Sequence, residues 1–507
     1  MESLNVANLL DLRARLDPER TFFTASGEAR TFSQVEADSQ RFAGALAEMG
    51  VQPRQRVVLM LPNTADFPTA YYGALNLGAV PVPINVTSPS PEVAYYLADS
   101  DAVALVAAEG VLPAALEGFA QVGTCRHLIV AGEGAPPARA HRLRDLLGRA
   151  RPLGEIARTG AAEEAVILYT AGTTGRPRGV VLTHFNYYFS ANFISRDFWR
   201  VGPEDVILMV SPAAHIFGQM LLSAALVTRA RLSLLPRFEP EAFLRTIQQD
   251  RVTFFAGVPT LAHLMLHSPQ VENFDLSSLR AVMFSGAPLH PQVAEQFRKR
   301  FGVELSTGYG MTEGVPFTFL TGDRFDSAPP GSVGLPALNT EIRIVDEGDQ
   351  PVAAEQLGEI VVRGPQVFQS YLNRPEETTA AMRSGWFHTG DIGRLDAQGH
   401  LYIVDRLKDM IKRSGYAVSP AEVERVLAAH PSVAESAVVG VFDAKVGEEV
   451  KAFVVLRPGA RATAEELIAH CKTQLAAYKY PRLVEFREAL PKNAAGKVLR
   501  RALRDPA

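Results

Sequence analysis

The segment that decides the fold runs from residue 57 to residue 84 and reads VVLMLPNTADFPTAYYGALNLGAVPVPI. Its first five residues, Val57–Leu61, are apolar and begin with β-branched side chains, which favours a strand that stops at Pro62. Residues Asp66–Gly78 place apolar side chains at the spacing of one helix face, and Ala79–Ile84 is strand-like again. A strand, a helix and a strand in this order predict parallel strands in an α/β fold.

The same alternation continues along the chain. Further short apolar stretches with strand character lie at Val103–Ala107, Leu128–Ala131, Ala165–Tyr169, Val180–Leu182, Leu232–Leu235, Thr253–Ala256 and Arg280–Ser285. Because helical segments separate strands of this kind, we expect parallel sheets and an α/β class for this part of the chain.

The composition changes near Ile403–Lys412, and a different pattern follows. Helices are expected at Ser419–Ala429 and Ala464–Ala476, and strands at Ser436–Val441, Val450–Leu456 and Leu483–Phe486. These elements predict an α+β unit of about 100 residues, which is enough for an independent domain.

The bulk composition is that of an ordinary globular protein. The chain has 507 residues and a formal net charge of −4, so it lacks the basic field that nucleic-acid or anionic-membrane partners usually require. Cys125 and Cys471 have no metal-ligand spacing around them and indicate reduced thiols of a cytosolic protein. The start of the chain has no basic-then-apolar pattern of a signal peptide, and we expect a cytoplasmic location.

One stretch has the length and composition to be weighed as a membrane span. Val206–Val227 contains no Asp, Glu, Lys or Arg. The stretch is interrupted, however, by Pro212, His215, Gly218 and Gln219. This favours a strand at Val206–Val210, a loop, and a buried helix from about Phe217. We therefore expect no transmembrane segment.

The richest chemical signal is the segment Tyr169–Val180, which reads Y-T-A-G-T-T-G-R-P-R-G-V between two expected strands. Its glycines let backbone N–H groups face an anion, while threonine hydroxyls and two arginines supply further donors. It is not a Walker A loop, because Pro177 and Arg178 stand where Gly-Lys would be needed. The residues alone leave a flexible surface loop and a phosphate cradle equally favoured.

This loop resembles the phosphate-binding motif of the adenylate-forming superfamily, which includes acyl-CoA synthetases, peptide-synthetase adenylation domains and beetle luciferases. The resemblance runs from about Thr31 to Arg501 with the motifs in the family's order, and it is greatest to fatty-acyl-CoA and coumarate-CoA type ligases. The family usually has Ser at the position of Ala171 and Lys at that of Arg178. The resemblance implies that the β- and γ-phosphates of ATP are held by Thr170, Gly172, Thr173, Thr174, Gly175 and Arg178.

Two further segments resemble the family's nucleotide motifs. In Gly308–Glu313, the resemblance implies that Tyr309 stacks on adenine, Thr312 touches the α-phosphate and Glu313 holds Mg²⁺. Mg²⁺ prefers one or two carboxylates together with phosphate oxygens, which agrees with this role. In Ser285–Pro288, the small residues Gly286, Ala287 and Pro288 would contact adenine. Taken alone, the two segments also fit a strand–turn with a surface acid and an ordinary turn.

The ribose and the hinge between domains are assigned by the same resemblance. Asp391, in W-F-H-T-G-D, matches the aspartate that accepts the ribose hydroxyls, and Arg406 matches a second ribose or phosphate contact. A structural ion pair between these two residues is the alternative. Lys408 occupies the position of the hinge.

Three basic or small-residue positions complete the resemblance. Lys497 matches the lysine that bridges the acid's carboxylate and the α-phosphate, although a lysine near a chain end is normally just solvated. Lys412, Ser414 and Gly415 match the segment that turns in for thioester formation. His215 matches a gate between the nucleotide and the acid, although a lone histidine in an apolar stretch is more often part of the core.

The resemblance implies a large N-terminal domain of stacked α/β sheets with a barrel-like subdomain, and a small mobile α+β C-terminal domain. The expected divisions are an N-terminal domain over 1–404, a hinge over 405–408 and a C-terminal domain over 409–507. It further implies an acid–thiol ligase that uses ATP and Mg²⁺ to form an acyl-adenylate, and coenzyme A to form a thioester.

The expected acid is an apolar monocarboxylate. The pocket walls implied by resemblance carry no charge, and they are Phe217, Val258, Gly286, Gly308, Met311 and Val315. A small wall such as Gly308 leaves room for a long chain, so fatty acids are expected first and aryl or arylpropenoic acids second. Delivery to a carrier-protein thiol or to oxygen, and a nucleotide-binding protein without chemistry, are the alternatives. The oligomeric state stays open between a monomer and a homodimer.

Overall fold

The computed structural model describes residues 4–170, 176–286, 289, 291–325, 327–413, 416–443, 445–492 and 498–504. The chain forms two compact units, one of Met1–Glu341 with Arg363–Phe387 and one of Ile342–Val362 with His388–Ala507. The second unit thus contains an excursion from the middle of the chain as well as the C-terminal part. The proposed hinge at 405–408 lies inside this unit, and its role stays a prediction.

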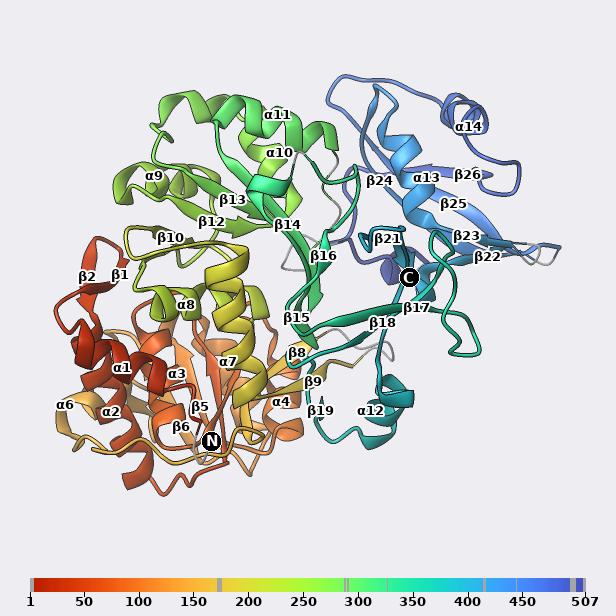
Figure 1. Cartoon of the computed structure of the whole chain (residues 1–507). Helices are drawn as coiled ribbons and strands as arrows, with labels where there is room; N and C mark the ends of the chain where they lie inside the picture. The colour runs from red at the N-terminus through yellow and green to blue at the C-terminus, as the bar shows by residue number, and fades with distance from the viewer. Residues whose placement is uncertain are drawn as a thin grey trace. The chain divides into compact units, whose positions relative to one another are not determined.

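The first sheet of the larger unit contains the segment that opens the sequence argument. Strand β3 (Arg56–Met60), helix α3 (Asp66–Asn76) and strand β4 (Val80–Pro83) follow one another, and the two strands are parallel neighbours, as predicted. The full order is β4-β3-β5-β6-β7, all parallel, with β5 (Ala102–Ala108), β6 (His127–Ala131) and β7 (His141–Arg142), drawn in orange in Figure 1.

The second sheet has the order β16-β15-β14-β13-β12-β10-β11-β1-β2. Its parallel strands are β14 (Glu304–Met311), β13 (Ala281–Phe284), β12 (Phe254–Gly257), β10 (Val206–Met209), β11 (Arg231–Leu234) and β1 (Thr21–Ala25). Antiparallel strands complete both edges, namely β15 (Gly314–Leu320), β16 (Leu335–Pro336) and β2 (Glu28–Thr31). Because the central strands are parallel, their carboxyl ends meet at one edge, where ligands bind in sheets of this kind.

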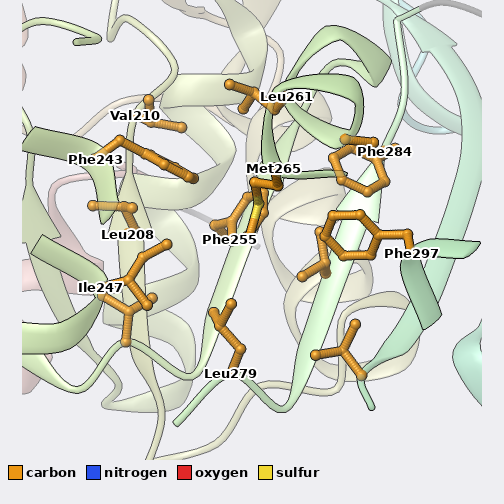
Figure 2. Close-up of a cluster of buried hydrophobic side chains, with 14 of the residues drawn as sticks. Leu208, Val210, Phe243, Ile247, Phe255, Leu261, Met265, Leu279, Phe284 and Phe297 are labelled. Carbon is orange, nitrogen blue, oxygen red and sulfur yellow. The ribbon is translucent and has the colours of Figure 1, made fainter. Parts of the chain in front are cut away.

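A row of aromatic rings fixes the strands of this second sheet. Phe243 of α9 (Pro240–Asp250) packs edge-on against Phe255 of β12 with ring centroids 5.3 Å apart, and Phe284 of β13 packs on Phe297 of α11 (Pro291–Phe301) at 5.1 Å. The same cluster includes Met265 of α10 (Pro259–His267), as Figure 2 shows. Buried aromatic pairs hold β12 and β13 firmly, and these two strands lead into predicted site residues.

The strands that flank the glycine- and threonine-rich loop differ from expectation. β8 (Glu164–Thr170) and β9 (Arg178–Thr183) pair antiparallel, and β19 (Ser370–Tyr371) adds antiparallel to β9. The sequence predicted the strands but placed them among parallel ones. The connection between Thr170 and Arg178 is shorter than the crossover of about a dozen residues that parallel neighbours need, so the chain returns alongside the strand that it has just left.

Most of the remaining regular structure of the larger unit is helical. The other helices are α1 (Asn8–Leu16), α2 (Phe32–Glu48), α4 (Ser90–Asp99), α5 (Leu112–Ala120), α6 (Leu143–Arg149), α7 (His184–Phe193), α8 (Ile216–Thr228) and α12 (Pro375–Ala381). The uncharged stretch Val206–Val227 divides into β10 and α8, as predicted. Among the described helices, none is long and apolar enough to cross a membrane.

The smaller unit contains two sheets. The first has the order β17-β18-β20-β21, with β17 (Glu341–Val345), β18 (Gly358–Arg363), β20 (Phe387–Leu395) and β21 (Leu401–Arg406). The second is built from β22 (Ile411–Arg413), β23 (Tyr416–Val418), β24 (Val433–Asp443), β25 (Gly447–Leu456) and β26 (Leu483–Phe486), with helices α13 (Pro420–Ala428), α14 (Ala464–Lys472) and α15 (Arg501–Arg504). The predicted α+β elements of this region are confirmed, and their apolar side chains form two clusters.

Helix α2 carries a buried carboxyl group, that of Glu36. Glu36 of α2 is 8% exposed, and its Oε1 accepts a hydrogen bond from Gln40 Nε2 at 2.8 Å. Its Oε2 is buried and has no hydrogen-bond partner among the described residues. Burial raises the pKa of this carboxyl from its ordinary 4.5 to about 7, so folding favours the protonated acid.

The stability of the fold should therefore depend on the charge of Glu36. Above pH 4.5 the unfolded chain ionises this group, whereas the folded chain keeps it protonated up to about pH 7, so stability should fall as the pH rises through this window. We expect the free energy of unfolding in urea to be higher for Glu36→Gln than for the unsubstituted protein at pH 8, by up to about 3 kcal/mol. Near pH 4.5 the two free energies should be equal. Glu48→Gln, at an exposed position of the same helix, is the control. An equal shift for both variants would contradict the assignment.

Candidate active site

The two ends of the predicted phosphate loop lie side by side. Thr170 is the last residue of β8 and Arg178 the first of β9, and the two are directly opposite each other in the antiparallel pair. Opposite residues of such a pair point to the same face. Gly172, Thr173, Thr174 and Gly175 lie outside the described residues.

Both of these opposed side chains have a buried donor that is not used. Among the described residues, no group pairs with Thr170 Oγ1 or with Arg178 Nε, although both atoms are buried. A buried polar group without a partner costs about 1–3 kcal/mol, and more when it is charged. An anion held at the base of the loop would satisfy both groups, so the residues present fit the predicted phosphate ligand.

The Arg178 guanidinium lies between two carboxylates. Its Nη1 is 3.3 Å from Glu377 Oε2 and its Nη2 is 3.9 Å from Glu313 Oε1, while its side chain is 17% exposed. Its Cζ lies 4.3 Å from the centroid of the Tyr371 ring. The planar fork of an arginine allows these contacts together, which the single ammonium of a lysine would not reproduce.

Glu313 is also held by Tyr371, the residue whose ring contacts Arg178. It is buried in the turn between β14 and β15, next to half-buried Thr312, and its Oε1 accepts a hydrogen bond from the Tyr371 hydroxyl at 2.9 Å. Burial and the neighbouring Glu313 carboxylate raise the pKa of Tyr371, so the hydroxyl remains a donor at neutral pH.

The donor set around Glu313 fits Mg²⁺ that binds together with a nucleotide. The described residues contain no group of three or more His, Cys, Asp or Glu side chains that could hold a metal ion. Mg²⁺ is usually bound by one or two carboxylates plus substrate phosphates, and Glu313 lies next to the phosphate-loop residue Arg178.

The carboxyl ends of three parallel strands bring the predicted adenine and acid contacts together. The Ser285 hydroxyl, just after β13, donates to the carbonyl of Gly308 in β14 at 2.9 Å. Gly286 has φ +81°, and a Cβ there would lie 3.6 Å from Val258 Cγ1, just after β12. The Tyr309 ring is buried and packs on Phe317 with centroids 5.5 Å apart. Ala287 and Pro288 lie outside the described residues.

Gly308 is a glycine because its neighbours fill the space of a side chain. A Cβ there would lie 2.8 Å from Phe198 Cζ and 2.6 Å from the Thr318 carbonyl oxygen. Phe198 ends the π-helical turn Ile194–Phe198 that follows α7, and its ring also packs on Phe319. The space on this side of Gly308 is therefore occupied, contrary to the sequence argument that it leaves room for a long chain.

His215 stands at the start of α8, in a loop that is fixed by two buried amides. Asn63 accepts from Ala213 N at 3.0 Å and donates to the carbonyls of Met209, Ser211 and Leu235. Gln219 Nε2 donates to the Ala213 carbonyl at 2.6 Å. Burial lowers the pKa of His215, and its Nε2 is buried without a partner among the described residues. A neutral imidazole with an unused nitrogen can serve a ligand.

The smaller unit carries the predicted ribose contacts. Asp391 and Arg406 are directly opposite each other on β20 and β21, and Arg406 Nε lies 3.3 Å from Asp391 Oδ1. The aspartate is buried, whereas the Arg406 side chain is 38% exposed. The structural ion pair that the sequence left as an alternative is thus present, and a ribose role for either residue stays a prediction.

The predicted thioester and lysine segments are described in part. Lys412 lies on β22 with an exposed side chain, and its backbone N donates to Glu448. Ser414, Gly415 and Lys497 lie outside the described residues. Lys492 and Val498 form an antiparallel bridge, which brings together the two ends of the segment that contains Lys497.

Sequence reasoning missed the residues that contact and fix the predicted site residues. Tyr371, Glu377, Asn63 and Gln219 were not predicted as site residues. The first three act through contacts with residues far away in the chain, whereas Gln219 contacts Ala213 in its own loop. One signal was available. Pro375 followed by two glutamates, Glu376 and Glu377, is the pattern of a helix start, where acids are favoured in the first turn. The signal marks a helix start but does not show what it faces.

The comparisons with known proteins agree with this geometry. A profile of the AMP-binding enzyme family matches residues 10–372. The chain belongs to this family. A second profile, for the AMP-binding enzyme C-terminal domain, matches residues 422–497.

Individual relatives extend the similarity to the whole chain. The long-chain-fatty-acid–CoA ligase of Bacillus subtilis (strain 168) is 35% identical over 98% of this chain and 93% of its own. The feruloyl-CoA synthase of Amycolatopsis sp is 35% identical over 97% of each chain. Among solved structures, an anthranilate CoA ligase in complex with anthranoyl-AMP matches with a TM-score of 0.92 and 28% identity, over 99% of this chain and 97% of that one.

These findings confirm the predicted superfamily and the predicted fold class. The chain is a member of the adenylate-forming superfamily, with a mixed α/β fold of several sheets and a smaller C-terminal part. It is an AMP-forming acid–thiol ligase of the acyl- and aryl-CoA ligase group, and enzymes of this class use ATP, Mg²⁺ and CoA.

The amide of Asn63 should be important for the stability of the His215 loop. Asn63→Ala leaves buried backbone groups of β10 and its following loop without partners, and we expect a loss of about 2–3 kcal/mol in urea unfolding. Asn85→Ala, which removes only exposed bonds to Thr87, should change stability by less than about 1 kcal/mol. Equal losses in the two variants would refute the role of Asn63.

Proposed function

We propose that this chain is an ATP-dependent acyl-CoA synthetase that activates an apolar monocarboxylic acid, with fatty acids as the first substrate class. The observation that carries the proposal is the uncharged edge where Val258, Gly286 and Gly308 come together at the carboxyl ends of parallel strands. A dicarboxylate would need a cation at this wall, and none of the six positions assigned to it is charged. The similarity to a long-chain-fatty-acid–CoA ligase supports the same substrate class.

The first half-reaction is attack of the acid's carboxylate on the α-phosphorus of ATP with release of pyrophosphate. Thr170 and Arg178 would hold the β- and γ-phosphates through the donors that are unused at the base of the loop. Lys497 would bring the carboxylate and the α-phosphate together, and Thr312 would contact that phosphate. Mg²⁺ held by Glu313 would supply neutralising charge at the phosphates. Asp391 and Arg406 would bind the ribose.

The second half-reaction is attack of a thiol on the acyl carbon with release of AMP. The smaller domain would rotate about Lys408, which removes Lys497 and presents the segment that contains Lys412, Ser414 and Gly415. A glycine at position 415 leaves room for a pantetheine arm, which favours CoA as the acceptor. A carrier-protein thiol is the alternative acceptor. The two buried, unpaired thiols Cys125 and Cys471 are in keeping with a cytoplasmic location.

A second substrate class is favoured by one observation. Phe198 fills the space on the Cβ side of Gly308, so a wall that was assigned room for a long chain is closed on that side. A flat ring fits against such a wall better than an extended chain does. The similarity to a feruloyl-CoA synthase and to an anthranilate CoA ligase supports an aryl or arylpropenoic acid as this second candidate.

An acid panel tests the proposal and separates the two substrate classes. With ATP, Mg²⁺ and CoA, AMP release should be measured for saturated acids from acetate to palmitate, for benzoates, for cinnamates and for malonate. We expect kcat/KM to be highest for an apolar monocarboxylate. A preference for malonate would refute the argument from charge, and the absence of AMP formation with every acid would refute the ligase proposal.

The two proposed lysine roles can be separated by half-reaction. Lys497→Ala should reduce ATP–pyrophosphate exchange about 10²–10³-fold, because a placed cation of this kind contributes ~2.7–4 kcal/mol to the transition state. The same variant should still convert preformed acyl-AMP and CoA to thioester at nearly the unsubstituted rate. Lys492→Ala, which removes a surface ion pair with Glu435 near the same segment, is the matched control and should affect neither step. Equal loss of both steps in Lys497→Ala would show the assignment to be wrong.

A further inference from the structure

Helix α4 contacts both ends of the phosphate loop. Its residues Tyr95 and Asp99 are four positions apart and therefore on one helix face. The Tyr169 hydroxyl, at the end of β8, donates to Asp99 Oδ2 at 2.8 Å. The Tyr95 hydroxyl donates to the carbonyl of Pro177, just before β9, at 2.7 Å. One helical turn thus binds the residue that enters the loop and the residue that leaves it.

Arg374 joins these two contacts. Its Nη2 donates to the Tyr95 hydroxyl at 3.1 Å and lies 3.7 Å from Asp99 Oδ1. The adjacent Asn373 donates to the Asp99 backbone carbonyl at 2.7 Å. The Asp99 side chain is only 12% exposed and that of Arg374 is 32% exposed, so the pair is partly shielded from water.

The same guanidinium continues to the charged side of the loop. Arg374 Nε lies 3.7 Å from Glu377 Oε1, and Glu377 Oε2 is the atom that pairs with Arg178. Arg374 is therefore connected through Tyr95 to the Pro177 end, through Asp99 to the Tyr169 end, and through Glu377 to Arg178. These contacts come from segments that are far apart in the sequence and belong to the same compact unit.

The rings in this region limit the movement of the first loop end. Tyr169 packs on Tyr96 of α4 with ring centroids 4.6 Å apart, which leaves its hydroxyl aimed at Asp99. Burial raises the pKa of both Tyr169 and Tyr95, so both hydroxyls remain donors at neutral pH.

We propose that Arg374 is a positioning residue that, with Tyr95 and Asp99, fixes the spacing of the two ends of the phosphate loop and so prepares it for the β- and γ-phosphates of ATP. The inference rests on the proposed function for the identity of the ligand. Ends of a binding segment that are held in place before the ligand arrives reduce the entropy cost of binding. The benefit should therefore fall on ligands that carry β- and γ-phosphates, namely ATP and pyrophosphate, and not on AMP.

The test compares nucleotides and not only activities. In Arg374→Ala, calorimetric titration with Mg-ATP should show an affinity reduced about 10- to 100-fold, the range for loss of a hydrogen bond to a charged group. Titration with AMP should be unchanged, and so should thioester formation from preformed acyl-AMP. In steady state the KM for ATP should rise with kcat little changed. Arg374→Lys, which keeps a charged donor, should recover part of the ATP affinity.

Two matched controls separate positioning from general stability. Arg280 pairs with Asp205 at 3.1 Å with similar exposed fractions, 39% and 12%, at the amino ends of the parallel strands. Arg280→Ala should leave ATP and AMP affinities equal to those of the unsubstituted protein. Tyr95→Phe removes one hydroxyl that contacts the end of the loop and should weaken the binding of ATP. Tyr96→Phe, one residue further on, should leave ATP binding unchanged.

The outcomes distinguish this inference from the proposed function. If the unsubstituted protein binds no ATP and forms no adenylate, the proposed function fails. If it does both, but Arg374→Ala and Tyr95→Phe weaken ATP and AMP equally or weaken neither, the positioning role is overturned. Tyr95→Phe keeps the test decisive if Arg374→Ala fails to fold, because it deletes a single oxygen at a half-buried position.

Discussion

A partly buried guanidinium with two carboxylates around it is the interaction on which the site depends. Arg178 lies within 3.3 Å of Glu377 and 3.9 Å of Glu313, and its Cζ lies over the Tyr371 ring, 4.3 Å from the centroid. A buried charge is tolerated only when it is paired and hydrogen-bonded, so these partners fix the start of β9. Two acids on one base also leave excess negative charge. A divalent cation that arrives with a polyphosphate would neutralise this charge, while the Nε of Arg178 remains available to the anion.

Other contacts of the larger unit hold the carboxyl ends of the parallel strands, where further predicted site residues lie. Aromatic pairs such as Phe284 with Phe297 hold the parallel strands whose carboxyl ends carry Ser285 and Val258. Buried amides hold the loop of His215 in the same way. Apolar packing thus places the strands, and a few buried polar contacts fix the short irregular segments at their ends. Polar contacts are expected at these segments, because buried backbone N–H and C=O groups outside helices and strands need other hydrogen-bond partners.

Departures from the sequence predictions occur where contacts are not local. The strands around Tyr169–Val180 were located correctly, but their pairing is antiparallel, because the connection between them is too short for the crossover that parallel strands need. The small residue Gly308 was interpreted as open space, whereas Phe198 from a distant helical turn fills it. In both cases the local residue type was informative. The neighbour that determined its meaning lay elsewhere in the chain.

Residue patterns along the chain were enough to order the strands and helices and to recognise, in the motifs from Thr170 to Arg406, the resemblance to adenylate-forming enzymes. Apolar periodicity and turn residues act over a few positions, and motif order is a property of the chain. Only the tertiary structure decided that Glu377 pairs with Arg178 across 199 positions, and that Arg374 joins Tyr95 to Asp99. These charges are ordinary surface residues in sequence. Burial and proximity, which arise only on folding, bring them to the ends of the predicted phosphate loop.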